Sequence, residues 1–254
     1  MFYFPYRGVY AQPAREFHDV TIPTHDGVKL HGWFFPAEGR VRGTIVQFHG
    51  NAGNVTSHFL QLAWAPRHGY ALLCFDYRGY GRSPGVPSAA GLEADALAAI
   101  HFAQHLPESD SGEQLVLYGQ SLGGAVLLHA LGSVRDRRRI GAVVIEGSFH
   151  SYEDAAAGVL FRHALLFPFT GLAYATISDR YDAAPYVASV SPTPLLVIHG
   201  TQDPVIAPAF GRALYDLGRE PKELWWIEGG GHVDALARRN VRARLLAYLS
   251  RALK

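Results

Sequence analysis

The sequence predicts a single α/β domain with a mostly parallel sheet and helices on both faces. Three observations support this fold class: the length of 254 residues, the alternation of short apolar runs with longer helical segments, and the clustering of many of the 27 glycines just after those runs. A chain of this length can bury roughly 70–75% of its unfolded surface, so one core needs no disulfide or metal. We find no internal repeat or polar linker, and residues 1–254 are therefore expected to form one domain.

Two segments with alternating polarity come first. Residues His18–Pro23 and Val28–Phe35 alternate between apolar and polar side chains, and Asp26-Gly27 lies between them. Asp-Gly between such segments favours a tight hairpin turn. We therefore expect an antiparallel hairpin that leads into the parallel sheet, with about eight strands in all.

Short apolar runs rich in Val, Ile and aromatic residues follow, and such runs are typical of strands buried on both faces. They are Thr44–Phe48, Ala71–Phe75, Gln114–Tyr118, Ala142–Ile145, Leu195–Ile198 and Glu223–Ile227. The expected helices between and after them are Asn54–Ala65, Ala89–His105, Leu122–Ser133, Pro208–Leu217 and Val233–Ala252. Repeated strand–turn–helix units predict a parallel sheet covered on both faces.

Residues 148–191 interrupt this alternation. They contain no convincing strand, but they include an aromatic and aliphatic segment, Val159–Phe169. Arg162, His163 and Pro168 argue against a transmembrane helix here. We expect a small helical cap over the carboxyl ends of the strands, where α/β sheets bind their ligands, and it could serve as a lid or as an acyl-binding wall.

Composition excludes several classes of protein. The formal net charge is +1, so no overall field attracts nucleic acid or anionic lipid. Cys74 is the only cysteine, which excludes intramolecular disulfides and multi-cysteine metal sites, and its apolar neighbours predict burial. Neither a secretory signal nor a long apolar stretch is present, so we expect a soluble cytoplasmic protein without nucleic-acid or membrane contact.

Gly119-Gln120-Ser121-Leu122-Gly123 lies between an expected strand and an expected helix. A serine on such a turn is exposed on a strained backbone, and glycine two residues to either side avoids collisions with the neighbouring elements. The helix N-terminus behind it favours developing negative charge. The alternative is an ordinary glycine-rich turn with a capping serine, but the context favours a nucleophile.

A serine nucleophile needs a base, and the base needs an orienting acid. Asp203 and His232 follow the last two expected strands, in the chain order Ser, acid, His. Asp203 before Pro204 also fits an Asx turn or a helix cap. Glu146 is a rival acid because it follows the strand Ala142–Ile145. We assign Ser121, Asp203 and His232 as the catalytic residues.

The oxyanion formed during acyl transfer needs two backbone N–H donors. We assign one to Leu122, directly after the nucleophile, and the other to Asn51 in the small loop after Thr44–Phe48, with Ala52 as the alternative. Within the same loop, we expect His49 to brace the backbone and Asn54 to cap a helix.

No metal, Walker or dinucleotide motif is present, so we expect neither a cofactor nor a metal. The basic run Arg135–Arg139 could contact phosphate or anionic lipid, but a solvated loop at a helix C-terminus is favoured.

The chain resembles the α/β-hydrolase superfamily. It is most similar to small serine hydrolases with His-Gly-Asn-Ala-Gly-Asn, Asp-Tyr-Arg-Gly-Tyr-Gly and Gly-Gln-Ser-Leu-Gly-Gly, found here at 49–54, 76–81 and 119–124. The resemblance spans nearly the whole chain and implies an eight-stranded sheet, a cofactor-free Ser-His-Asp mechanism and ester-type substrates. By the same resemblance, Asp76–Gly81 is a structural turn beside the site. Relatives often carry an N-terminal anchor or lipoprotein signal, which is lacking here, so the protein is either cytoplasmic or trimmed at its start.

We therefore expect a carboxylesterase-like serine hydrolase that acts on esters of small to medium acyl chains. A peptidase, a thioesterase and an acyltransferase share the same triad and stay open as alternatives. The peptidase alternative is supported by four acidic residues that could bind a free amino terminus, Glu153, Asp154, Asp179 and Asp182. A non-catalytic ligand-binding protein on the same fold is the alternative from another class.

Overall fold

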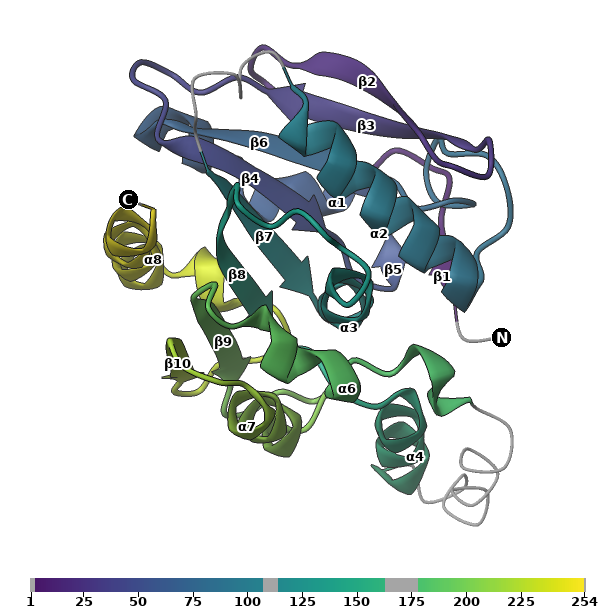
Figure 1. The fold of residues 1–254 in the computed structure, drawn as a ribbon, viewed down its shortest axis with the longest axis vertical. Coiled ribbons are helices and arrows are strands. Elements are labelled where there is room, and N and C mark those ends of the chain that lie inside the picture. Colours follow the sequence, from purple (N-terminus) through teal and green to yellow (C-terminus); the bar gives the residue numbers. More distant parts are fainter. Residues whose placement is uncertain (1–2, 107–113, 163–177, 254) are drawn as a thin grey trace.

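A computed structural model describes residues 3–106, 114–162 and 178–253, with side chains left out at 159–162. Its main sheet has eight strands in the order β10-β9-β8-β7-β4-β6-β3-β2, which confirms the predicted fold class (Figure 1). Pairing is parallel from β10 to β6 and antiparallel where β3 meets β6 and β2. The strands are β2 His18–Pro23, β3 Lys29–Phe35, β4 Gly43–Phe48, β6 Tyr70–Phe75, β7 Leu115–Gln120, β8 Ile140–Glu146, β9 Leu195–Gly200 and β10 Lys222–Ile227.

The predicted hairpin is present, with His18 opposite Phe34 and Pro23 opposite Lys29. Asp26 accepts a hydrogen bond from the Thr24 hydroxyl, and Gly27 adopts a φ of 86° in the turn. The left-handed backbone at Gly27 explains why glycine follows the aspartate there.

The two faces of the sheet are covered by different helices (Figure 1). One core contains residues of α2 (Ala89–Gln104), α3 (Leu122–Leu131), α6 (Ala184–Val187) and α7 (Pro208–Leu217). The other contains residues of α1 (Val55–His58), the 3-10 helices η1 (Phe59–Gln61) and η2 (Ala65–His68), and α8 (Arg239–Ala252). Strands β4 and β6 to β9 are buried along their whole length, as the continuous apolar runs predict.

Two helix predictions are wrong at their boundaries. The helix expected over Asn54–Ala65 ends at His58 and continues as separate 3-10 turns. The side-chain amide of Gln47 donates to the His58 carbonyl at 2.9 Å, and the N–H of Leu62 bonds to Phe59 instead. A buried side chain from the sheet thus takes the carbonyl that a longer helix would use.

The last helix was expected over Val233–Ala252 but begins at Arg239, after the short 3-10 helix η7 at Ala235–Ala237. Val233 has a φ of 46°, which no residue of an α-helix adopts. The residues directly after His232 therefore form a shaped loop rather than a first helical turn.

The N-terminal segment forms a small second sheet that was not predicted. β1 (Phe4–Pro5) pairs in parallel with β5 (Ala52–Gly53), in the loop after β4. The carbonyl of Tyr6 also accepts from the N–H of Gly81 at 3.0 Å. The start of the described chain is thereby attached to two loops at the carboxyl edge of the sheet.

The cap expected at 148–191 lies partly outside the described residues. Its described part holds α4 (Tyr152–Arg162), η5 (Asp179–Tyr181), α6 and η6 (Ala188–Val190), and no strand. Val159–Phe169 falls outside the residues whose side chains are described, so its role as an acyl wall stays a prediction.

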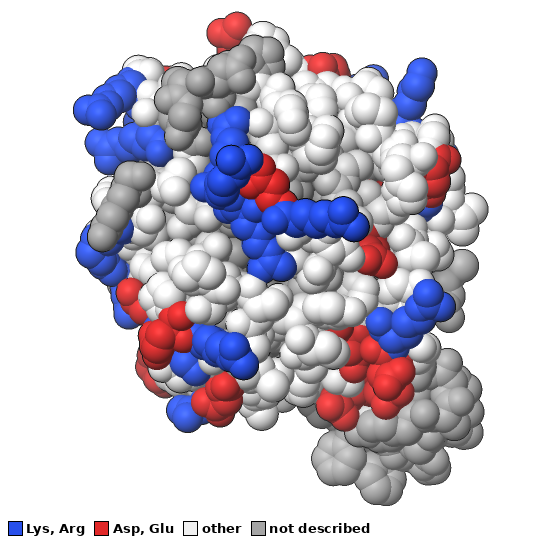
Figure 2. All heavy atoms as spheres, viewed as in Figure 1, with Lys and Arg blue, Asp and Glu red and all other residues white. Residues whose placement is uncertain are grey.

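Side chains of both charge signs occur across the face seen in Figure 2, separated by broad uncharged areas. In the basic run, Arg137 donates from Nε to the Val134 carbonyl at 3.2 Å and Arg139 donates to the Gln104 carbonyl at 2.6 Å. These two arginines thus bind carbonyls near the ends of α3 and α2. Within residues 3–106, 114–162 and 178–253, no helix is long and apolar enough to cross a membrane.

Candidate active site

Ser121 lies on a strained turn between β7 and α3, with φ 49° and ψ −121°. A Cβ added at Gly119 would lie 2.6 Å from Gly124 Cα, and one at Gly123 would lie 2.1 Å from the Phe48 carbonyl oxygen. The N–H of Ser121 donates to the Glu146 carbonyl at 2.9 Å. The glycines of the motif are therefore required by close backbone contacts on both sides of the turn.

The structure brings together the three residues assigned to catalysis. His232 Nε2 lies 3.0 Å from Ser121 Oγ, and His232 Nδ1 lies 2.8 Å from Asp203 Oδ2. A carboxylate accepts only, so Nδ1 carries the proton and Nε2 is left to accept from the serine hydroxyl. This is the arrangement in which an imidazole can take the proton of a nucleophilic serine.

Asp203 contacts the imidazole of His232 and also forms an Asx-type turn, the two roles that its sequence context allowed. Its Oδ1 accepts from the N–H groups of Val205 and Ile206, both at 2.8 Å, in an Asx-type turn. Burial raises the pKa of Asp203, but the hydrogen bond and charge of His232 and these two backbone donors outweigh it, and the net shift is downward. The aspartate is thus fixed in position and kept ionised at neutral pH.

Gly147 and Val233 shape the space around the His–Asp pair. Gly147 has a φ of 57°, and a Cβ there would lie 3.4 Å from His232 Nδ1 and 3.5 Å from Asp203 Oδ2. The side-chain amide of Gln61 donates to the carbonyl of Val233 at 2.7 Å. Gly147 therefore lies close to the His–Asp pair, and the hydrogen bond from Gln61 holds the loop that carries the imidazole.

Glu146, the rival acid, does not contact His232. Its carboxylate accepts from the Tyr118 hydroxyl and from the N–H of Ala235, the latter at 2.9 Å. Burial raises the pKa of this carboxyl group. Glu146 supports the loop after His232, while Asp203 contacts the imidazole itself.

A second histidine, which was not predicted from the sequence, lies beside the acid. His199 is fully buried on β9, and its Nε2 lies 3.0 Å from the Ile206 carbonyl and 3.5 Å from Asp203 Oδ2. Burial lowers its pKa, so the imidazole is neutral at neutral pH. The sequence offered no signal for this contact, since a spacing of four residues brings side chains together only within a helix.

The loop at 49–54, which holds the expected second oxyanion donor, lies against Ser121. A Cβ added at Gly50 would lie 3.6 Å from Ser121 Cβ. His49 donates from Nδ1 to the Gly50 carbonyl at 2.7 Å, and His58 donates from Nε2 to the Ala52 carbonyl at 2.7 Å. Burial lowers the pKa of both imidazoles, that of His49 to about 3.

These bonds fix the direction of the loop's peptide groups. The carbonyl of Gly50 and the N–H of Asn51 belong to one trans peptide and point in opposite directions. Leu122, the other expected donor, is the first residue of α3, where N–H groups have no acceptor within the helix. Asn54 caps α1 through its side chain, and the two supporting roles expected of His49 and Asn54 are confirmed.

The turn at Asp76–Gly81 is joined to this loop. Asp76 accepts from the N–H of Val55 at 2.7 Å through Oδ1, and from the N–H of Arg82 at 3.2 Å through Oδ2. Gly81 has a φ of 47°, and a Cβ there would collide with the Asp76 carboxylate. Cys74, just before the turn, is buried and contacts Gln47 Oε1 at 3.0 Å, as expected for a structural cysteine.

Two of the acidic residues considered for a peptidase site have contacts within the cap region. Asp182 accepts from the N–H of Tyr152 at 2.8 Å, and burial raises its pKa. Asp154 lies 3.8 Å from His150. Across the described ranges, no three His, Cys, Asp or Glu side chains gather as a metal site would require.

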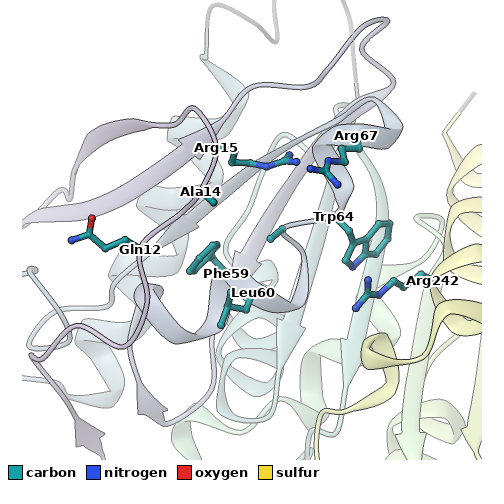
Figure 3. Close-up of a pocket in the computed structure, with 9 residues that line it drawn as sticks. Gln12, Ala14, Arg15, Phe59, Leu60, Trp64, Arg67 and Arg242 are labelled. Atoms are coloured by element: carbon teal, nitrogen blue, oxygen red, sulfur yellow. The ribbon is translucent and has the colours of Figure 1, made fainter.

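A separate hollow of about 400 Å³ lies between the N-terminal segment, η1 and α8. Figure 3 shows the guanidinium groups of Arg15 and Arg67 pointing toward each other above Phe59, and Arg242 beside Trp64. Neither the triad nor residues 49–54 line this hollow. It is therefore a surface feature distinct from the site around Ser121.

The chain is similar to known hydrolases in sequence and in fold. The family model described as serine aminopeptidase, S33, matches residues 39–178. The uncharacterized protein YfhR of Salmonella typhi is 39% identical over 250 residues, covering 94% of this chain and 82% of its own.

Among solved structures, an esterase of Pyrococcus furiosus superposes with a TM-score of 0.75 at 22% identity, covering 98% of this chain and 97% of its own. An acetyl xylan esterase of Paenibacillus superposes with a TM-score of 0.71 at 22% identity, covering 94% and 86%. These structures share the fold of the chain.

Proposed function

Because the chain belongs to the serine aminopeptidase S33 family of α/β-hydrolases, we propose that it is a serine hydrolase that cleaves carboxylic esters. The observation that carries this proposal is the continuous contact from Ser121 Oγ through His232 to Asp203, at 3.0 and 2.8 Å. Nucleophile, base and orienting acid are the three groups that acyl transfer to serine requires.

In the proposed reaction, Ser121 Oγ attacks the ester carbonyl carbon while His232 Nε2 takes the hydroxyl proton. Asp203 stabilises the imidazolium that forms. The backbone N–H groups of Asn51 and Leu122 donate to the oxyanion of the tetrahedral intermediate. The carbon–oxygen bond to the alcohol then breaks, and the imidazolium protonates the departing alkoxide to leave an acyl-enzyme.

Deacylation repeats these steps with water as the nucleophile. His232 takes a proton from water as it attacks the acyl carbon, and then returns that proton to Ser121 Oγ when the acid leaves. The cycle consumes one ester and one water and yields one acid and one alcohol, with no cofactor. The buried, neutral His199 and the backbone donors to Asp203 support a fixed acid throughout.

We propose small to medium acyl chains as the preferred substrates. The support is the apolar composition of Val159–Phe169, which the sequence places in the cap region after β8. Apolar walls with a few fixed polar groups are typical of small-molecule sites.

The test is hydrolysis of p-nitrophenyl esters from acetate to palmitate, with Ser121→Ala measured alongside. Activity that depends on Ser121 and peaks at short or middle chain lengths is the expected result. Equal turnover by the wild type and Ser121→Ala would refute the assignment of the nucleophile.

Covalent labelling by a fluorophosphonate separates the alternatives. Labelling of Ser121 without turnover of any ester would point to a peptidase, a thioesterase or an acyltransferase. If the wild type is neither labelled nor active, a non-catalytic ligand-binding protein is the better description.

A further inference from the structure

The side chain of Asn51 is held by two donors that lie far from it in the sequence. The hydroxyl of Tyr80 donates to Asn51 Oδ1 at 2.9 Å, and the backbone N–H of Phe4 donates to the same oxygen at 3.1 Å. One donor comes from the turn at Asp76–Gly81 and the other from β1. Asn51 is thus fixed both through its backbone neighbours and through its side chain.

Tyr80 is placed to act as a rigid donor. Its side chain is fully buried, and its ring lies 5.2 Å from that of His49 and 6.2 Å from that of Tyr77, centroid to centroid. Burial raises the pKa of the Tyr80 phenol, so the hydroxyl keeps its proton at neutral pH. Packing fixes the position of the Tyr80 hydroxyl, which donates its hydrogen bond to the side-chain oxygen of Asn51.

The neighbouring contacts hold the same region from the other side. β1 pairs with Ala52–Gly53, and the Asn54 side-chain amide donates to the carbonyls of Tyr6 and Gly8 at 2.9 and 2.7 Å. His49 holds the Gly50 carbonyl. The residue whose N–H is assigned to the oxyanion therefore lies between two fixed peptides, and the bonds to Oδ1 fix its side chain as well.

We propose that Tyr80 is a positioning residue of the oxyanion hole, which acts by holding the side-chain amide of Asn51. The inference rests on the proposed function, because it concerns the donor of that reaction. A donor to an oxyanion contributes only where its N–H lies at hydrogen-bonding distance from the developing charge, so a small displacement is costly. The turn at Asp76–Gly81, which was expected to be structural only, thereby also contributes to the proposed reaction.

Tyr77 supplies a matched control within the same turn. It is also a fully buried tyrosine, yet its hydroxyl has no hydrogen-bond partner within the described part of the chain. Tyr80→Phe and Tyr77→Phe each remove one oxygen atom from a buried ring. They differ in the contacts of that oxygen: the Tyr80 hydroxyl bonds to Asn51 and also lies against the backbone N–H of Phe4, the other donor to Asn51.

The experiment measures kcat and KM for p-nitrophenyl butyrate in the wild type and both variants, with thermal unfolding as a check on folding. We expect Tyr80→Phe to lower kcat about 10- to 100-fold with KM changed by less than about twofold. Tyr77→Phe is expected to keep the wild-type kcat. Inhibition by an alkyl boronic acid, which forms a tetrahedral anion on the serine, should weaken with Tyr80→Phe in parallel with kcat/KM.

A double-mutant cycle tests whether Tyr80 acts through Asn51. Asn51→Ala keeps the backbone N–H and removes the acceptor, so adding Tyr80→Phe to it should lower kcat no further. A further loss of the full size would overturn the inference, and so would equal kcat values for Tyr80→Phe and Tyr77→Phe. In either case the esterase assignment stands as long as activity depends on Ser121. Activity independent of Ser121 would refute the proposed function itself.

Discussion

The buried carboxylate of Glu146 accepts a hydrogen bond at 2.9 Å from the backbone N–H of Ala235, three residues after the imidazole of His232. The backbone carbonyl of the same glutamate accepts from the N–H of Ser121 at 2.9 Å. One residue at the end of β8 therefore contacts both the turn that carries Ser121 and the loop that carries the proposed base. Its role is to fix the distance between them.

Glu146→Gln is expected to destabilise the fold by about 1–3 kcal/mol, because the amide NH2 would face either the Ala235 N–H or the Tyr118 hydroxyl, both donors at present. We expect kcat to fall by less than about 100-fold, since Glu146 does not contact the imidazole. Urea unfolding and ester hydrolysis measure the two effects. Glu146→Asp, which shortens the side chain but keeps the carboxylate, serves as the comparison.

Asp203→Asn is expected to lower kcat by about 10³- to 10⁴-fold, because an amide can donate to His232 Nδ1 and then favours the wrong tautomer. The measurement is ester hydrolysis with saturating substrate. A larger loss for Glu146→Gln than for Asp203→Asn would show that the rival acid performs the role assigned here to Asp203.

The buried histidines make the protein sensitive to acid. Burial lowers the pKa of His49 to about 3, so below pH 6.5 the unfolded state binds a proton that the folded state does not. Stability is therefore lost as the pH falls from about 6.5, at about 1.4 kcal/mol per pH unit from this group. The lowered pKa values of His58 and His199 act in the same direction, and the raised pKa of Glu146 acts against them.

Comparison with His49→Gln isolates the contribution of His49. The unfolding free energy of the wild type minus that of the variant should fall by about 1.4 kcal/mol for each pH unit below about 6. Urea unfolding at pH 7.5, 6.0 and 5.0 gives the values. A difference that does not change with pH would contradict a neutral, buried His49.

Two glycines should respond to alanine with opposite signs. A Cβ at Gly123 would lie 2.1 Å from the Phe48 carbonyl oxygen, so Gly123→Ala should destabilise by about 1–3 kcal/mol or more and reduce activity. Gly158 lies inside α4, and its added Cβ would lie 3.9 Å from the Phe210 ring, with no nearer contact among the described side chains. Gly158→Ala should stabilise by about 0.5–1 kcal/mol through helix propensity. Thermal unfolding measures both, and a stabilising Gly123→Ala would contradict the described packing of α3 on β4.

Local sequence patterns were sufficient to predict the fold and the three residues that meet at the site. The apolar runs identified the strands because strands buried on both faces need continuous hydrophobic sequence. Ser121, Asp203 and His232 were found because each follows a strand, and parallel strands bring such turns to one edge of the sheet. That inference needed only the position of each residue directly after a strand, not its separation from the other two in the sequence.

Contacts that depend on tertiary packing could not be predicted from the sequence. The early end of α1 depends on Gln47, a strand residue that takes the carbonyl of His58. The pairing of Phe4–Pro5 with Ala52–Gly53 involves only two residues on each side and leaves no periodic signal. The difference between Tyr77 and Tyr80 is a hydrogen bond across 29 residues, and the sequence shows two similar tyrosines.

The attachment of β1 beside Ser121 also bears on how the protein should be handled. An affinity tag or fusion partner joined ahead of Phe4 would be tethered to a strand that pairs with the loop beside Ser121, so a displacement of that strand would also displace Ala52 and Gly53. At the other end of the chain, Leu253 lies beside Gly43 and Gly141, where β4 and β8 begin, on the opposite edge of the sheet. A purification handle after α8 therefore lies away from the edge that carries Ser121, and rates measured on such a protein should not be altered by the tag.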